Sequence, residues 1–153
     1  MAYTPLYSYE ASDAVQLAGT HSQFSLDDGT TWKPLKGCQE LGDIGSVSAS
    51  VEQTTIDDTI KRYRGSIKDS EDKELTMYYY EDDANQEALR QAADSLSIIK
   101  VRHQFVNGKI ATYDFALLGW RMSSGNAEAL MQFVVVGKLN SEVTWTTATV
   151  VTP

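Results

Sequence analysis

The stretch SIIKVRHQFVNGKIATYDFALLGW, residues 97–120, restricts the fold more than any other part of the sequence. Its central Asn-Gly pair is typical of a tight turn between two antiparallel strands. A two-residue turn would mix polar and apolar side chains on both faces of the pair. A three-residue loop, with Gly108 in a left-handed bulge, pairs residue 103 with residue 111 and collects the apolar side chains on one face. We therefore expect a β-hairpin with one buried face.

The same period-two alternation recurs along most of the chain. It predicts strands in SVSASVEQT, ELTMYYY, EALMQFVVVGKLN and SEVTWTT, and a second hairpin around Asp28-Gly29. In the first of these strands, Val47, Ala49 and Val51 should face a core. The pattern predicts seven or eight strands in a mainly antiparallel β protein.

Residues 83–96 differ, because their apolar side chains recur at helical spacing. Asp82 or Asp83 is a suitable N-cap, and acidic residues at this end favour the positive pole of the helix dipole. We therefore expect one helix beside the strands.

The length of 153 residues suits a single domain, residues 1–153, with one core. Residues 1–20 are mostly polar and are expected to form an arm, and residues 148–153 a loose tail. No apolar run approaches the roughly 20 residues of a membrane span, and the N-terminus lacks the features of a signal peptide. Cys38 is the only cysteine, which excludes an intramolecular disulfide and favours a reducing compartment.

The sequence offers no recognisable catalytic or metal-binding motif. His21 and His103 are the only histidines, and their spacing does not suit a metal site. His103 alternates with apolar neighbours on a strand and is expected to be a half-buried, hydrogen-bonded residue and not a catalytic one. We predict no catalytic residue, no cofactor and no metal site, although two carboxylates brought together by the fold could still hydrolyse a glycoside.

The formal net charge of −8 argues against tight binding of nucleic acid, because such binding needs clusters of Lys and Arg. An acidic protein could still lie close to DNA without sticking to it.

The connection at residues 54–74 is much longer than a turn between neighbouring strands requires. Eleven of the residues from Asp57 to Glu74 are charged, and both signs are present. The segment is either a mobile solvent loop or a docking element with apolar anchors. The residues expected to make the contact are Asp57, Asp58, Ile60, Arg62, Tyr63, Arg64, Ile67 and Asp69.

The order of these parts, from about residue 24 to residue 147, resembles the tail tube (major tail) proteins of long-tailed, non-contractile bacteriophages. The resemblance rests on SVSASVEQT, TTIDDT, KRYRGSIKD, ELTMYYYEDD and the start of the helix, NQEALRQA. It implies two antiparallel sheets packed as a β-sandwich with one flanking helix, the inner sheet joining its neighbours into a ring-shaped barrel. Residues 54–74 would then be the contact between stacked rings.

The resemblance also implies a function and partners. Six copies would form a ring, and stacked rings would surround a tape-measure protein and conduct double-stranded DNA during ejection without binding it specifically. A tail terminator and distal tail or baseplate proteins would bind the ends, in a virion tail assembled in the host cytoplasm. Ser48, Ser50 and Glu52 are expected to line a net-negative lumen.

Three alternatives remain open at this level. The chain could be the inner tube of a contractile tail or of a type VI secretion system. It could be a monomeric carbohydrate-binding β-sandwich that uses its eight tyrosines and three tryptophans. It could also be an acidic hydrolase.

Overall fold

The computed structural model describes residues 4, 6 and 14–148. Most of the predicted arm, residues 1–20, and nearly all of the predicted tail, residues 148–153, therefore lie outside the described residues. The elements are β1 (His21–Ser25), β2 (Lys33–Pro34), β3 (Cys38–Glu40), β4 (Val47–Glu52), β5 (Tyr63–Asp69), β6 (Lys73–Tyr78), α1 (Ala84–Asp94), β7 (Ile98–Gln104), β8 (Lys109–Ser123), β9 (Gln132–Leu139) and β10 (Thr144–Thr147).

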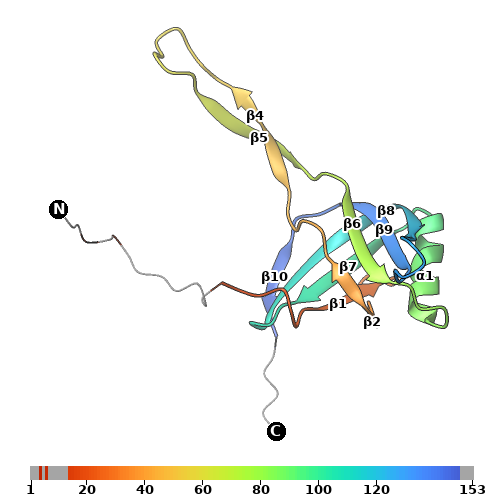
Figure 1. The fold of residues 1–153 in the computed structure, drawn as a ribbon. Coiled ribbons are helices and arrows are strands. Elements are labelled where there is room, and N and C mark those ends of the chain that lie inside the picture. The colour runs from red at the N-terminus through yellow and green to blue at the C-terminus, as the bar shows by residue number, and fades with distance from the viewer. Residues whose placement is uncertain (1–3, 5, 7–13, 149–153) are drawn as a thin grey trace.

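These strands form two antiparallel sheets (Figure 1). The larger sheet has the order β2-β1-β7-β8-β9-β6-β3, and β10 also pairs with β8. The smaller sheet contains only β4 and β5, which leave the body as a long hairpin. The predicted mainly β fold with two antiparallel sheets and one helix is confirmed.

The large sheet curls around one core because β8 is long and changes its neighbours. The first part of β8 pairs with β7 and β10, and its last part pairs with β9 across a bulge between Leu117 and Gly119. Across the curved sheet, Lys73 of β6 lies over the ring of Tyr113 of β8, with β9 between the two strands. The core combines side chains from five strands and the helix: Phe24, Leu75, Met77, Leu89, Val101, Phe115, Phe133 and Val135.

The hairpin of β7 and β8 has the predicted register. His103 pairs with Ala111, and the amide of Phe105 donates to the carbonyl of Lys109 across a three-residue loop. Gly108 has φ +85°, and no atom lies within 4 Å of where its Cβ would be. The backbone conformation, and not a lack of space, therefore requires glycine here.

Replacing Gly108 with valine is expected to lower the free energy of unfolding by more than about 1 kcal/mol, because a β-branched residue fits a positive φ poorly. Thermal and urea unfolding measure the effect, with Gly108→Asn as a control, because asparagine tolerates a positive φ better than valine does. An unchanged melting temperature for Gly108→Val would contradict the bulge assignment.

The helix is confirmed, with bounds slightly shorter than the predicted 83–96. Asp83 is the N-cap and accepts from the amide of Asn85, and the helix ends at Asp94. Leu96 was expected on the buried stripe, but it follows the helix with φ +54° and is exposed. Sequence periodicity missed Gln86, whose buried side chain donates to the carbonyl of Tyr78 and accepts from the amide of Tyr80.

Two expectations about residues 47–74 were wrong. β4 is not half-buried: Val47 is 82% exposed, because β4 pairs only with β5 and no described layer covers the hairpin. The segment 54–74 is not one long loop, since Tyr63–Asp69 form strand β5 and Lys73 already begins β6.

Candidate functional site

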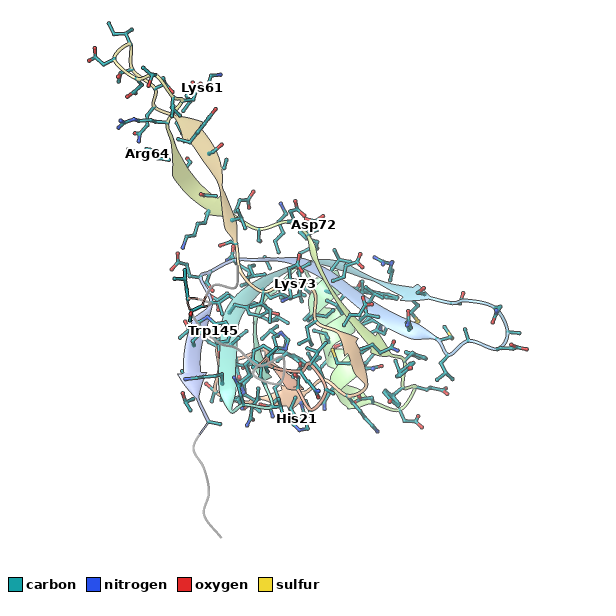
Figure 2. The ribbon with its side chains drawn as sticks, turned by 60° about the vertical axis from the view of Figure 1, so that its left-hand side comes forward. His21, Lys61, Arg64, Asp72, Lys73 and Trp145 are labelled. Atoms are coloured by element: carbon teal, nitrogen blue, oxygen red, sulfur yellow. The ribbon has the colours of Figure 1, made fainter. Side chains whose placement is uncertain are left out.

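The β4–β5 hairpin is the most unusual feature of the surface (Figures 1 and 2). Every residue of β5 is exposed, and the hairpin carries large apolar side chains in solvent. Ile56 and Ile60 lie at its tip, and Val47 and Ile67 lie nearer the body. An isolated two-stranded sheet is marginally stable in water, and its free edges invite pairing with another chain. The hairpin therefore has the properties of a surface that another molecule covers.

The tip is a braced turn. The Asp58 carboxylate accepts from the amide of Thr55 at 2.8 Å and pairs with the Arg62 guanidinium at 3.0 Å. The amide of Arg62 donates to the Thr54 hydroxyl, and the carbonyl of Arg62 accepts from the amide of Gln53. Asp58 and Arg62, predicted as contact residues, therefore hold the turn together.

Most of the remaining predicted contact residues are free to meet a partner. Asp57 and Arg64 are exposed, as is their neighbour Lys61, and none of the three forms an ion pair with another described residue. Tyr63 and Ile67 of β5 are 57% and 87% exposed, respectively. The tip thus offers two isoleucines beside uncompensated cations.

Strand pairing places the predicted lumen residues on one face. Ser48 pairs with Lys68, and Glu52 with Tyr63, so these four side chains share a face. Ser50 pairs with Gly65 on the same side. The face is polar, as expected, and it also includes the Lys68 cation.

The hairpin root is fixed to the body by polar contacts. The Lys68 ammonium binds the Glu142 carboxylate at 2.9 Å. The Ser70 hydroxyl accepts from the amide of Leu139 at 3.1 Å. These contacts join the end of β5 to the end of β9 and to the connection that follows it.

Lys73, where the chain re-enters the body, carries a buried amine. The residue is 3% exposed, and its Nζ has no hydrogen-bond partner among the described residues. Nζ lies 4.4 Å from the centroid of the Tyr113 ring, a cation–π geometry. Burial lowers the pKa of Lys73 to about 8, while the nearby Asp43 charge acts in the opposite direction.

His103 lies in a buried chain of hydrogen bonds beside this lysine. Its Nδ1 is 2.6 Å from the Ser22 hydroxyl, and its Nε2 is 2.8 Å from the Tyr113 hydroxyl. Burial, with a smaller effect from Lys73, lowers the pKa of His103 to about 3. The ring is hydrogen-bonded as predicted, but it is fully buried and not half-buried.

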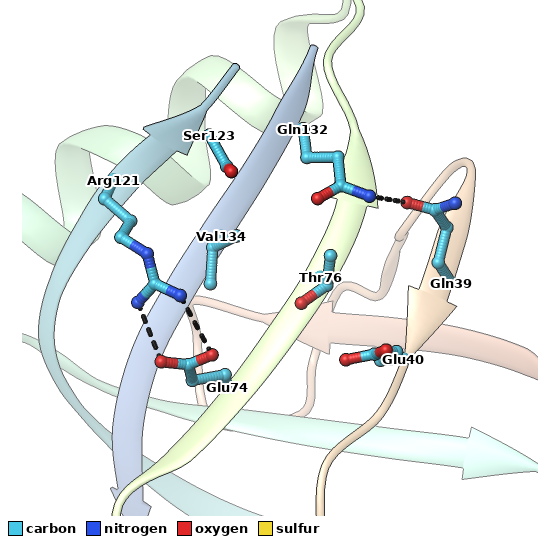
Figure 3. Close-up of a pocket in the computed structure, with 8 residues that line it drawn as sticks. All are labelled: Gln39, Glu40, Glu74, Thr76, Arg121, Ser123, Gln132 and Val134. Atoms are coloured by element: carbon cyan, nitrogen blue, oxygen red, sulfur yellow. Dashed lines mark hydrogen bonds and ion pairs between the residues drawn. The ribbon is translucent and has the colours of Figure 1, made fainter. Parts of the chain in front are cut away.

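The outer face of β3, β6, β9 and β8 contains an open polar depression of about 420 Å³ (Figure 3). The Arg121 guanidinium binds both oxygens of Glu74, at 2.7 and 3.1 Å, and the Gln132 amide donates to Gln39. The ion pair holds the pKa of Glu74 below its usual value. These groups satisfy one another at a solvated sheet face.

Both cations on the outer face of β7 have partners within the chain. The Lys100 ammonium lies 2.9 Å from the Asp114 carboxylate. The guanidinium of Arg102 stacks 4.1 Å from the centroid of Trp32 and donates to Gln23. Asp114 thus neutralises Lys100 across the strand pair.

The tryptophans do not gather into a platform for a sugar. Trp32 is covered by a guanidinium, and Trp120 donates to the Asp94 carboxylate near the helix end. Trp145 stacks against Phe105. The three rings lie on separate strands or loops and have different partners.

Within residues 4, 6 and 14–148, no group of three or more His, Cys, Asp or Glu side chains could hold a metal ion. No helix in that part of the chain has the length and hydrophobicity needed to cross a membrane.

The sequence and the fold were each compared with those of known proteins. The phage tail tube protein family matches residues 10–148. No curated protein sequence matches the chain.

Among solved structures, the chain is similar to the SPP1 tail tube, with 18% identity and a TM-score of 0.63 over 84% of this chain and 76% of that one. It is similar to the tail of an empty gene transfer agent particle with C6 symmetry, with 11% identity and a TM-score of 0.66 over 91% and 99%. A sheath–tube complex of an extracellular contractile injection system matches with 9% identity and a TM-score of 0.63 over 92% and 100%.

Proposed function

Because this chain belongs to the phage tail tube protein family, we propose that six copies form a ring and that the rings stack into a hollow tube. The chain is a structural subunit of such a tube. Six subunits per ring are supported by the C6 symmetry of the gene transfer agent tail, and stacking is supported by the helical arrangement of that tail, which contains a chain of the same fold.

The exposed β4–β5 hairpin is the observation that supports this proposal most directly. It exposes apolar side chains at its tip and along both strands, and it leaves two strand edges without a described partner. Lateral pairing of these edges with neighbouring copies extends a sheet around a ring, and an axial contact of the tip extends the ring into a filament. The residues Asp57, Ile60, Tyr63, Arg64, Ile67 and Asp69 act in these contacts.

The test of assembly is the concentration dependence of the oligomeric state. Sedimentation of the full chain is expected to show large polymers that form above a critical concentration. A monomer at every concentration would contradict the proposal.

Ser48, Ser50 and Glu52 line the channel in this arrangement. The tape-measure protein fills it before ejection, and the terminator and distal tail proteins bind its ends in the virion. A duplex carries one negative charge per about 1.7 Å of its axis, so a polar or acidic wall lets it pass without being held. The net charge of −8 supports this role, although only charges within about 10 Å of the duplex act on it.

Replacing Glu52 with lysine in assembled tubes is expected to make them retain duplex DNA at low salt, with the binding lost as salt rises. Glu128→Lys, in the exposed connection between β8 and β9, makes the same charge change elsewhere and should have little effect. DNA retention measured against salt concentration distinguishes the two. Tight binding of duplex by the unchanged tube at physiological salt would contradict the conduit.

A contractile system is the second candidate, because the chain has the same fold as a chain in the sheath–tube complex of an extracellular contractile injection system. A gene for a sheath protein beside the gene for this chain would favour that system. A tail without a sheath favours the non-contractile one.

A further inference from the structure

Strand β10 has a free edge in the large sheet. Among the described strands it pairs only with β8, so its other edge has no partner in the single chain. All four of its residues are exposed, and none of them is charged. A free, exposed and uncharged strand edge is the kind of surface to which another chain adds a strand.

The two faces of β10 differ in chemistry. Trp145 pairs with Ala111, which is fully buried, so the indole lies on the core side of the sheet. The indole stacks on Phe105, and yet Trp145 is 58% exposed. Thr144 and Thr146 alternate with Trp145 and therefore lie on the opposite face. The edge thus presents an uncovered aromatic ring on one face and hydroxyl groups on the other.

Strand β4 has a free edge with the same division into two faces. Its apolar side chains alternate with its polar ones, which places Val47, Ala49 and Val51 on one face and Ser48, Ser50 and Glu52 on the other. The strand is regular and has a single charged residue. Its partner β5 is the poorer edge, because a register shift leaves an extra residue in β5, and such bulges hinder pairing at an edge.

A chain cannot join its own β4 to its own β10. The ion pair of Lys68 and Glu142 fixes the hairpin root beside the connection that leads into β10. From this root the hairpin projects away from the body, whereas β10 runs along the body (Figure 1). The free edges of β4 and β10 therefore both remain for other copies.

We infer that β4 of one copy adds to the free edge of β10 in the neighbouring copy of the same ring. The apolar face of β4 then covers the Trp145 indole, and Ser50 lies on the polar side with the hydroxyls of Thr144 and Thr146. A slip of one residue would place serines over the indole, so alternation fixes which faces meet. The contact joins two different surfaces, which allows a ring to close by rotation. This inference rests on the proposed ring and names the partner of the exposed hairpin edge.

A carboxylate placed on either face of β4 tests the match of faces. Ala49→Asp puts the charge on the face that covers Trp145 of the neighbour, and it should raise the critical concentration for assembly about tenfold or more. Ser50→Asp makes the same charge change at the next residue, on the polar face, and should have a much smaller effect. Both positions are exposed in the single chain, so neither change should alter the melting temperature of the monomer. Equal effects of the two changes on assembly would overturn the inference.

Cross-linking identifies the strand that β4 contacts. In a Cys38→Ser background, the double variant Ser50→Cys/Thr146→Cys is assembled and treated with a short cross-linker that joins two thiols. Each copy should become linked to its two neighbours in the ring, so a denaturing gel should show a ladder that ends at six chains. The matched control is Ser50→Cys/Ser123→Cys, whose second thiol is exposed at the far end of β8 and should give no ladder.

Failure of this contact and failure of the proposed tube give different results. Chains that stay monomeric at every concentration refute the tube and, with it, the pairing of β4 with β10. Tubes whose Ser50→Cys/Thr146→Cys chains give no ladder, a ladder equal to that of the control, or a ladder that continues past six chains leave the tube standing and overturn only the pairing.

Discussion

A chain in which Gln53–Arg62 is replaced by Asn-Gly is expected to fold normally and to form no tubes. Glu52 and Tyr63 are directly paired across β4 and β5, so an Asn-Gly turn joins them without disturbing the remaining strand pairs. The change removes both tip isoleucines and the braced turn, none of which contributes to the core. Its melting temperature should therefore equal that of the full chain, while polymer is lost at every concentration.

Single substitutions separate the contact from the length of the hairpin. Ile60→Ser should weaken assembly, because it removes an exposed apolar side chain from the tip. Leu130→Ser, at a position 69% exposed in the connection between β8 and β9, removes a comparable side chain and should have little effect. Tubes of normal length from the shortened hairpin would show that stacking does not use the tip.

Replacing Lys73 with methionine is expected to raise the free energy of unfolding at pH 7 by about 3 kcal/mol. Burial lowers the pKa of Lys73 from 10.5 to about 8, and each pKa unit corresponds to about 1.4 kcal/mol. Methionine has a similar length, needs no hydrogen bond and can contact the Tyr113 ring through its sulfur. Lys36→Met is the matched control, because its lysine also lies over a tyrosine ring but is exposed, and it should change stability little.

The pH dependence gives an independent check of Lys73. Between about pH 8 and pH 10.5 the unfolded chain keeps a proton that the folded chain has lost, so the stability of the folded state rises with pH. Urea unfolding at pH 7 and pH 9 should show this rise in the unchanged chain and a smaller one in Lys73→Met. A destabilised Lys73→Met protein with the same pH profile would show that the amine has a partner in solution.

The body of the fold was predictable because only one arrangement of its strands and helix buries the apolar side chains. In β7 and β8, alternation and Asn107-Gly108 leave a single register that buries one face, and His103 pairs with Ala111 accordingly. The helix was predictable for the same reason, except at Leu96, where the chain turns at a positive φ.

The hairpin was not predictable, because alternation does not identify what covers an apolar face. Val47 and Val51 have the pattern of a half-buried strand, yet both are exposed in the single chain. In Tyr63–Asp69, charged residues and Gly65 mask the strand, and only pairing with β4 reveals it. An apolar face that awaits another copy has the same sequence signature as one that packs within its own chain.

The buried amine of Lys73 was not predicted, because its signal in the sequence is weak. Lys73 stands two residues before Leu75 and four before Met77, on the same face of β6, and this position could have suggested burial.

Electron microscopy of the purified full chain at high concentration tests the central claim most directly. The account predicts hollow tubes of stacked rings with six subunits each, in which the β4–β5 hairpin of one ring reaches the next. Compact particles without a channel, or rings that never stack, would contradict it.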